Sequence, residues 1–238
     1  MVTLDPTTHT YSDSDDVTYQ SVTRFINKFV PQFDFENKSK QYASKYGLDV
    51  QDVRDSWKQK NKQSTDFGTL IHENVEHRLR HKQLPANCME PSVIEDIASQ
   101  LESEFAAGEF LLEQIVWDQA HMMAGTSDVI IDNANTFSIV DFKTNKQIKY
   151  SNDYEDKFLL KPVHHLPNGE YFKYALQLSF YAYMYGKKTN KTLDRLSFFW
   201  LKRKNNSYDN LKDSKWVRYN VPYLKDEVLD MLYHDKQD

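Results

Sequence analysis

The chain has 238 residues, of which 14% are aromatic and 6 are glycine, and its formal net charge at pH 7 is −5. This length and composition are typical of a packed globular protein with a full-sized core, and they exclude a disordered chain. The single cysteine, Cys88, excludes a disulfide framework, a four-cysteine zinc site and a cysteine-ligated iron–sulfur cluster. The negative charge gives no overall indication of a nucleic-acid partner, although lysines cluster locally.

The hydropathy pattern gives no indication of a membrane or secretory segment. No apolar run approaches the roughly twenty residues of a membrane span, and residues 1–16 are polar and partly acidic, unlike a signal peptide. We therefore expect a protein of a reducing, cytoplasmic compartment without membrane contact.

The first half of the chain is predicted to be mostly helical. Pro31 ends the first helix, Thr65 and Asp66 are typical N-caps of the fourth, and Pro91 lies in the first turn of the fifth. The spacing of apolar residues predicts helices over 17–30, 37–46, 50–60, 67–81 and 91–107.

The second half is predicted to be a β-sheet interrupted by one helix. Asp132–Asn135 has turn composition and joins two predicted strands as a hairpin. The polar stretch 147–169 is predicted to be irregular, and the helix over 170–185 is closed by Gly186. Runs rich in Val, Ile, Phe and Thr predict strands over 110–117, 122–131, 136–143, 195–202 and 216–221, followed by a short C-terminal helix.

This order of elements predicts an α/β fold, in which helices flank a mixed central β-sheet. We expect two parts, an N-terminal helical region of residues 1–66 and a core of residues 67–238.

Charged side chains within the predicted hairpin form the first candidate site. Asp141 and Lys143 point to the same face of their strand, and Asp128 on the partner strand can reach that face. A β core rarely buries charges unless they pair with one another or bind a metal. The alternative is an edge hairpin with solvated charges, but the apolar residues that interleave with the charges argue against it.

A second group lies on the predicted helix over 67–81. Gly68, His72 and Glu76 follow at four-residue steps and share one face, and Gly68 would allow a close approach to another backbone. His72 and His77 are about 140° apart around the helix at roughly 100° per residue, so they cannot share a zinc ion as in zinc proteases. An exposed or structurally bonded histidine is the alternative for His72.

Two further candidates are less specific. Glu113 can reach the same cavity as Asp128, or it is a surface acid on an edge strand. Tyr174, Gln177 and Tyr181 form one stripe of the predicted helix, and an amide with two phenols can bind phosphates or stack on bases. An ordinary polar helix face would show the same stripe.

Taken in chain order, these motifs resemble the RecB-like exonuclease branch of the PD-(D/E)XK nuclease superfamily. Ser127 stands where the proline of that name would be. His9, Tyr11 and the segment 21–24 are also similar to the opening of phage-type exonucleases and of the mitochondrial genome maintenance exonuclease. The residues that carry the motifs are Gly68, His72, Glu76, Gly125, Asp128, Asp141, Lys143, Thr144, Gln177 and Tyr181.

The resemblance implies a restriction-endonuclease-like core whose cleft is roofed by the N-terminal helices. It also implies a DNA exonuclease that acts on single strands or free ends in recombination, repair or replication. Such an enzyme, of a kind that phages encode, would work with partner proteins of those processes. Endonucleases of the same fold, an inactive nucleic-acid-binding module and a small-molecule hydrolase with a carboxylate metal site are the alternatives.

The resemblance also implies a role for each site residue. Lys143 would orient the attacking water or offset developing charge, and Glu76 would support the metal ligands. One or two Mg²⁺ or Mn²⁺ ions, without an iron–sulfur cluster, would be held by Asp128, Asp141, the backbone carbonyl of Phe142, His72 and Glu113. The DNA would be contacted by Gln177, Tyr181, Thr144, Ser21 and Thr23.

Overall fold

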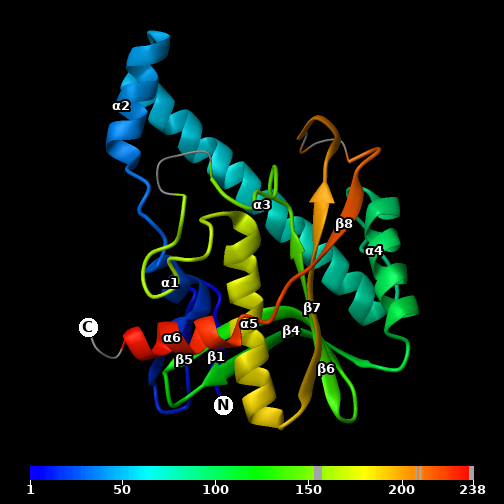
Figure 1. Ribbon diagram of the computed structural model, residues 1–238. Coiled ribbons are helices and arrows are strands. Elements are labelled where there is room, and N and C mark those ends of the chain that lie inside the picture. Colours follow the sequence, from blue (N-terminus) through cyan, green and yellow to red (C-terminus); the bar gives the residue numbers. More distant parts are fainter. Residues whose placement is uncertain (153–156, 207, 209–210, 236–238) are drawn as a thin grey trace.

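The computed structural model describes all residues except 153–156, 207, 209–210 and 236–238. Helices cover both faces of a mixed β-sheet, so the α/β fold expected from the sequence is confirmed (Figure 1). The elements are β1 (Thr3–Asp5), β2 (Thr10–Ser12), β3 (Thr18–Ser21), α1 (Val22–Asn27), α2 (Phe35–Tyr46), α3 (Val50–His81), α4 (Pro91–Glu104), β4 (Glu109–Asp118), β5 (Met123–Asp132), β6 (Thr136–Lys143), α5 (Glu170–Thr189), β7 (Thr192–Lys202), the 3₁₀ turn η1 (Lys204–Asn206), β8 (Lys215–Asn220) and α6 (Lys225–His234).

The strands follow the order β1-β2-β3-β5-β6-β7-β8, and β4 pairs with β5 outside this path. β5 and β6 form the antiparallel hairpin that the turn composition predicts, and β7 adds to β6 in parallel. The five strands predicted between residues 110 and 221 are confirmed within a few residues at each end.

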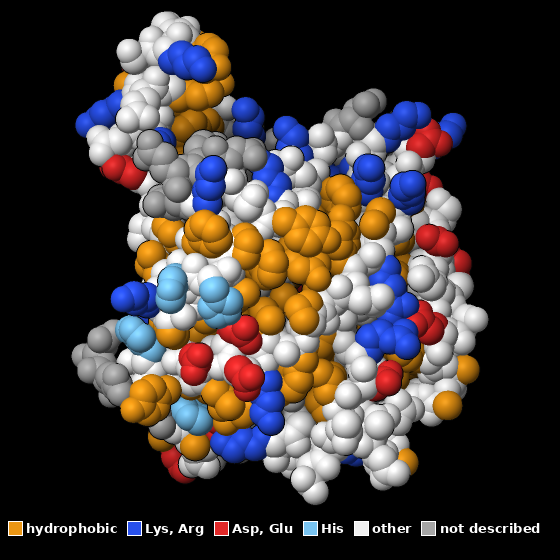
Figure 2. Space-filling view, in the orientation of Figure 1, with side chains coloured by type: hydrophobic (Ala, Val, Ile, Leu, Met, Phe, Trp, Pro, Cys, Tyr) orange, Lys and Arg blue, Asp and Glu red, His pale blue; other side chains and the backbone are white. Residues whose placement is uncertain are grey.

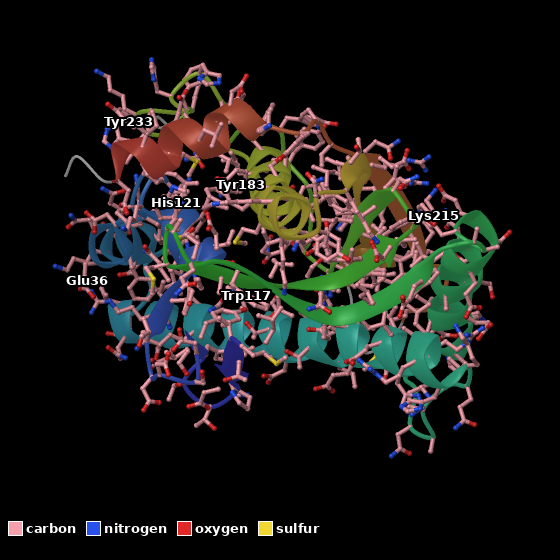
Figure 3. The ribbon with its side chains drawn as sticks, turned by 90° about the horizontal axis from the view of Figure 1, so that it is seen from below. Glu36, Trp117, His121, Tyr183, Lys215 and Tyr233 are labelled. Atoms are coloured by element: carbon pink, nitrogen blue, oxygen red, sulfur yellow. The ribbon has the colours of Figure 1, made fainter. Side chains whose placement is uncertain are left out.

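Two apolar cores lie on opposite faces of the sheet. Seen from below in Figure 3, α3 runs along one face, while α5 and α6 cover the other. Val129 and Val140 belong to the core with α3 and α4, and Ile130 and Ile139 to the core with α1, α5 and α6. Because side chains alternate along a strand, Asp141 leaves the sheet on the same face as Ile139, which α5 covers. Asp128 instead lines a cavity with residues of α3 and lies against His72.

The N-terminal segment differs from the prediction of a helix over 17–30. Residues 18–21 form β3, which pairs with β2 and, in parallel, with the start of β5. The Ser21 hydroxyl accepts a hydrogen bond from the backbone N–H of Arg24 at 3.2 Å, and this cap starts α1 at Val22. The apolar period that runs through Val22 and Phe25 is therefore helical only after the cap, and the region 1–66 begins with three strands.

Helix α3 corrects the prediction of two separate helices over 50–60 and 67–81. Thr65 and Asp66 do not cap a helix start, because the Thr65 hydroxyl donates to the carbonyl of Asn61 and Asp66 pairs with Lys62 one turn away. Neither proline nor glycine interrupts this polar stretch, so the helix continues through it in solvent. The boundary expected at residue 66 falls inside α3, and the division into two parts stays a prediction.

Two helix ends also differ from the prediction. α4 ends at Glu104 instead of residue 107. α5 continues past Gly186, which remains helical beside the Phe137 ring, and ends where Asn190 adopts a left-handed conformation with φ +57°. Asparagine tolerates this conformation better than most side chains, so a glycine is not needed at this end.

None of the described helices is long and apolar enough to cross a lipid bilayer.

Candidate functional site

The candidate site lies where the pairing of β5 is interrupted along one edge. β4 occupies the other edge of β5 from Asp132 to Met123, so β3 and β6 must share this one. β3 pairs with residues 123–124 and β6 with residues 129–132. None of the described strands pairs with residues 125–128 along this edge, and we refer to this stretch as the β5 gap. It runs from Gly125 to Asp128, two of the residues on which the resemblance rests.

Asp128 is the acidic end of the β5 gap. Its Oδ2 atom accepts a hydrogen bond of 2.7 Å from the backbone N–H of Phe142, which replaces a strand-to-strand bond at this position. The same oxygen lies 3.3 Å from Nδ1 of His72, which comes from α3. Asp128 therefore joins β6 and α3 at the point where the hairpin opens.

Lys143 and Asp141 form a buried ion pair on the face of the sheet that α5 covers. The ammonium of Lys143 lies 2.5 Å from Oδ2 of Asp141, and it donates a hydrogen bond of 3.3 Å to Oε1 of Gln177. It also lies 4.5 Å from the centre of the Tyr174 ring. The α5 stripe predicted from the sequence thus faces the acids, and it holds the lysine by an amide oxygen and an aromatic face.

Gly125 allows α5 to pack over the β5 gap. A Cβ atom at this position would lie 2.5 Å from Cε1 of Tyr181, which is closer than two non-bonded carbon atoms can approach. The Tyr181 side chain is buried, and its hydroxyl accepts a hydrogen bond of 2.8 Å from Nε2 of Gln177. The glycine, Tyr181 and Gln177 thus form a continuous support for the Lys143 ammonium.

Gly68 performs a similar task on α3, as the sequence predicts. A Cβ atom there would lie 3.1 Å from Oγ1 of Thr144, so the helix passes close to the end of β6. Thr144 is buried, and its carbonyl accepts a hydrogen bond from Arg203. This close approach brings His72, one turn further along α3, to Asp128.

A cavity of about 530 Å³ opens beside these groups. Glu113 lines it from β4 with φ +50°, a left-handed conformation that an L-residue rarely adopts within a strand. Glu76 also lines the cavity, although its carboxylate is held by Arg80 at 2.6 Å. The other lining residues are Pro6, His9, Gly68, Thr69, His72, Glu73, Thr126 and Asp128.

The N-terminal strands bring further residues to this region. His9, in the turn between β1 and β2, lines the cavity, and the Tyr11 hydroxyl lies 2.9 Å from Oγ1 of Thr126 in the β5 gap. Thr23 lines a separate hollow of about 290 Å³ with Tyr174 and Gln177. The sequence gives no role for His9 and Tyr11 beyond the resemblance, because two strands of three residues are too short to show a period.

The site places two acids, Asp128 and Asp141, close to each other and to two cations, His72 and Lys143. Burial opposes the charge on His72, but the neighbouring Asp128 carboxylate outweighs it and raises the pKa of His72 to about 9. Burial likewise opposes ionisation of Asp128, whereas the charge of His72 prevails and lowers the pKa of this carboxyl group. Burial and the charge of Asp128 raise the pKa of Asp141 to about 6, against the effect of Lys143.

Glu113 extends this acidic field to the cavity. Partial burial, followed by the charges of Asp128 and Glu76, raises its pKa to about 7. The site therefore contains more negative charge than its own cations neutralise, and part of that charge is removed by protonation near neutral pH.

Hard cations suit this donor set. Among the described residues, no three His, Cys, Asp or Glu side chains are assembled at the spacing of a bound metal ion. However, the buried Oδ2 of Asp141 accepts no well-aligned hydrogen bond from the described residues, although the Lys143 ammonium lies 2.5 Å away. The carboxylates of Asp128 and Asp141, with the nearby backbone of Phe142, are oxygen donors of the kind that Mg²⁺ and Mn²⁺ prefer.

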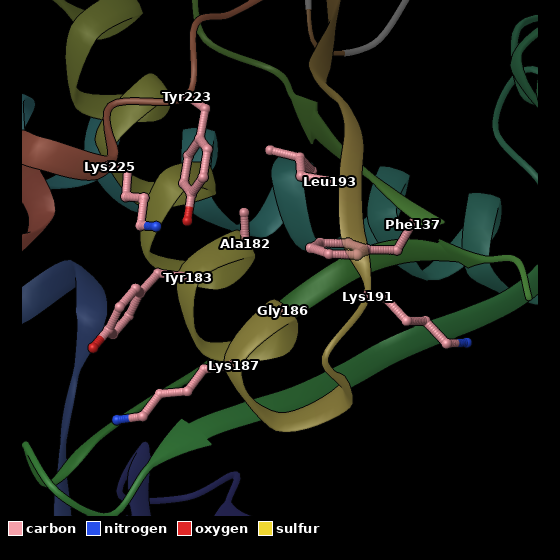
Figure 4. Close-up of a pocket in the computed structure, with 9 residues that line it drawn as sticks. All are labelled: Phe137, Ala182, Tyr183, Gly186, Lys187, Lys191, Leu193, Tyr223 and Lys225. Carbon is pink, nitrogen blue, oxygen red and sulfur yellow. The ribbon is translucent and has the colours of Figure 1, made fainter. Parts of the chain in front are cut away.

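A second large cavity, of about 480 Å³, lies at the far end of α5 (Figure 4). Its lining includes Lys187 and Lys191, but their ammonium groups are paired with Asp118 and Asp132. Its lining residues include no acidic side chain, and its floor is formed by Phe137, Ala182 and Leu193. This cavity therefore offers no counterpart to the acid and lysine cluster of the β5 gap.

Neither a protein-family model nor a curated protein matches the chain. A provisionally assigned exonuclease from Eubacterium rectale is similar to it in structure, with a TM-score of 0.39 and 15% identity over 92% of this chain and 79% of that one. The structure of the protein SSO0001 is similar with a TM-score of 0.27 and 15% identity over 71% of this chain and 72% of that one. Likenesses this distant do not indicate a function.

Proposed function

We propose that the chain is a metal-dependent deoxyribonuclease that hydrolyses phosphodiester bonds from single-stranded or free DNA ends. The observation that carries this proposal is the convergence of Asp128, Asp141 and Lys143 in the β5 gap, with His72 reaching them from α3. Two cations, His72 and Lys143, serve three acids in and beside the gap, Asp128, Asp141 and Glu113. This excess of negative charge is poorly suited to structural stability alone.

In this proposal Asp128, Asp141, the carbonyl of Phe142 and His72 hold one or two Mg²⁺ or Mn²⁺ ions, and Glu113 is a further ligand from the cavity side. When bound, such an ion lowers the pKa of a water molecule and offsets the charge that develops on the phosphate. The carboxylates supply the negative field that attracts the cation, and His72 must be neutral to donate a nitrogen lone pair.

Lys143 is the residue that acts on the reacting groups. Burial disfavours its charge, but the neighbouring Asp141 carboxylate dominates and raises its pKa, so it remains an ammonium. We propose that it orients the attacking water or offsets the charge of the phosphate. Gln177 and the Tyr174 ring fix its position, and Tyr181 fixes Gln177.

Contacts to the DNA backbone are proposed for residues around the gap. Thr23 and Gln177 line the hollow beside α5, so both are near a strand that passes this way. Ser21 is engaged in the cap of α1, and Thr144 and Tyr181 are buried. For these three residues, direct contact with DNA stays a prediction from the resemblance, and Glu76 is proposed to support the ligands through the acidic field of the cavity.

The test is digestion of 5′- and 3′-labelled single-stranded and double-stranded DNA in Mg²⁺ or Mn²⁺, with closed circular DNA and Lys143→Ala alongside. We expect stepwise shortening from one end and intact circles. We also expect Lys143→Ala to reduce turnover at least about 100-fold while DNA affinity is retained.

Two other outcomes would replace this proposal. Cleavage of closed circles would identify an endonuclease of the same fold. Binding of all these DNAs without cleavage in either metal would leave an inactive nucleic-acid-binding module. Lys143→Arg is a useful companion variant, because it keeps the charge but changes the position of the donors.

A further inference from the structure

The residues that precede the site on α3 form a separate projection from the body of the protein. We call residues 33–62 the arm; they comprise α2 and the first part of α3. Figure 1 shows the arm at the upper left, beyond the sheet, and Figure 2 shows hydrophobic and basic side chains together on its surface.

The arm is thinly packed. Within it only Ser39, Ala43 and Val53 are buried, and the last two are its only buried apolar residues. Four large apolar side chains are exposed instead: Phe33 at 59%, Tyr42 at 43%, Tyr46 at 54% and Leu48 at 51% of their surface. An exposed apolar surface of this kind on a projection is typical of a binding surface.

The exposed aromatic residues gather around Trp57 of α3. The ring of Trp57 lies 5.7 Å from that of Tyr42 and 6.2 Å from that of Phe33. Tyr42 in turn lies 4.6 Å from Tyr46 between ring centres, and the Lys45 ammonium lies 5.2 Å from the Tyr46 ring. Rings that are held by one another but open to solvent can stack with further flat groups at little entropic cost.

The charge of the arm is opposite to that of the remaining chain. The arm carries seven lysine and arginine side chains and five acidic ones, a net charge of +2 in a chain of net charge −5. The rest of the chain is therefore at −7. Lys58, Lys60 and Lys62 are exposed on α3, on the stretch that leads from Trp57 toward the site.

We propose that the arm binds single-stranded nucleic acid, with bases stacked on Tyr42 and Tyr46 and phosphates near the lysines of α3. This inference rests on the proposed function, because it places the strand that enters the β5 gap. Aromatic faces combined with positive charge bind single strands without sequence preference. A protein partner or a second copy of the chain would explain the apolar surface, but not the excess of lysine over acid.

The length of α3 sets the size of the bound strand. Trp57 and His72 are fifteen positions apart on one helix, which corresponds to about 22 Å at a rise of 1.5 Å per residue. At about 3.4 Å per stacked nucleotide, six or seven nucleotides span this distance. Strands shorter than this reach the β5 gap without reaching the arm.

The experiment measures the affinity for fluorescently labelled single strands of five and of twenty nucleotides, in EDTA so that no metal-dependent cleavage occurs. The variants are Tyr42→Ala/Tyr46→Ala and Lys58→Gln/Lys60→Gln. Tyr233→Ala is the matched control, since Tyr233 is 68% exposed on α6, across the sheet from α3 (Figure 3). Circular dichroism verifies that each variant keeps the helices of the arm.

We expect the tyrosine variant to weaken binding of the long strand about 10-fold or more and to leave the short strand unchanged. The lysine variant should lower the salt dependence of long-strand binding by about 0.7 per lysine removed. The control should bind both strands as the unmodified protein does.

Unchanged affinity of the tyrosine variant for the long strand would overturn the proposal. So would an equal loss for both lengths, which would place the effect at the site, and so would a change in oligomeric state on sedimentation, which would assign the surface to a second copy. Failure of the nuclease proposal is distinguishable, because it would appear as arm-dependent binding of the long strand by a protein that never cleaves it.

Discussion

The β5 gap and the arm meet on one helix, yet they are built in opposite ways. Around the gap, charges are buried and each cation has an acidic partner, whereas the arm exposes lysines and aromatic rings around two buried apolar residues. The charged groups around the gap are each held by more than one neighbour, as the Phe142 N–H and His72 hold Asp128. The arm can adapt to a flexible strand because few contacts fix it. Both regions include residues of the same helix, α3. The difference between them therefore comes from how closely their side chains are packed, and not from the type of secondary structure.

The largest expected effect on stability is that of Gly125→Ala. The added methyl group would overlap the Tyr181 ring, and the buried ring can move only by displacing Gln177 and the apolar core of α5. We expect a loss of about 2–3 kcal/mol in the free energy of unfolding. Chemical denaturation measures this loss, and Gly125→Ala/Tyr181→Leu, which removes the overlapping ring, should recover part of it. An unchanged free energy of unfolding would show that the β5 gap is not closely packed, and the contrast with the thinly packed arm would be lost.

Asp128→Asn tests the charge pairing of the gap. Without the carboxylate, burial dominates and the pKa of His72 should fall from about 9 to its ordinary value of 6.5 or below. In the metal-free protein the His72–Asp128 pair contributes stability that is fully present below pH 6.5 and is lost as the pH rises through 9. Titration of the His72 ring by NMR measures the pKa; a value that remains near 9 would show that Asp141, not Asp128, charges the ring.

The sequence predicts the gap much better than its surroundings. Period-two apolar residues place Asp128, Asp141 and Lys143 on paired strands, and a four-residue step aligns Gly68 with His72, because these relations are local. The sharing of one β5 edge by β3 and β6 is a long-range property, and two three-residue strands carry no period. The left-handed Glu113 in mid-strand likewise has no local signal, since glutamate is not a residue that favours it.

The arm was predicted less well for a related reason. Thr65 and Asp66 are good capping residues, but a cap is used only where the helix has another reason to begin. Here the preceding turns are already held by Asp49, which caps the start of α3 through hydrogen bonds to the N–H groups of Gln51 and Asp52. A polar helix in solvent and a polar linker have the same composition, so composition cannot tell them apart. The stretch before Thr65 is helical because α3 continues through it without a break.

Glu113→Gln should produce a smaller effect that depends on pH. The pKa of Glu113 is raised from 4.5 to about 7 in the folded protein, so the native state binds more protons than the unfolded state between these values. Its ionisation therefore destabilises the metal-free fold as the pH rises through this window. Because the side chain is only partly buried and solvent screens its charge, we expect a gain for the variant of about 1 kcal/mol at pH 8 and none near pH 4. Thermal unfolding at both pH values measures this, and an equal gain at both would assign the effect to the strained backbone instead.

The smallest expected effect is that of Gly47→Ala in the arm, and its position gives the sharpest contrast with Gly125→Ala. Gly47 caps the end of α2 with φ +64°, where a Cβ atom would meet no other group but would favour a different backbone conformation. The cost is about 1 kcal/mol. Since α2 packs mainly on α3, this cost should increase local opening of the arm without changing global unfolding. Hydrogen exchange should accelerate at the amides of α2 and remain unchanged in α5, whereas Gly125→Ala should accelerate both. Acceleration in α5 by Gly47→Ala would mean that the arm and the gap unfold as one unit, and the independence on which the adaptable arm depends would be lost.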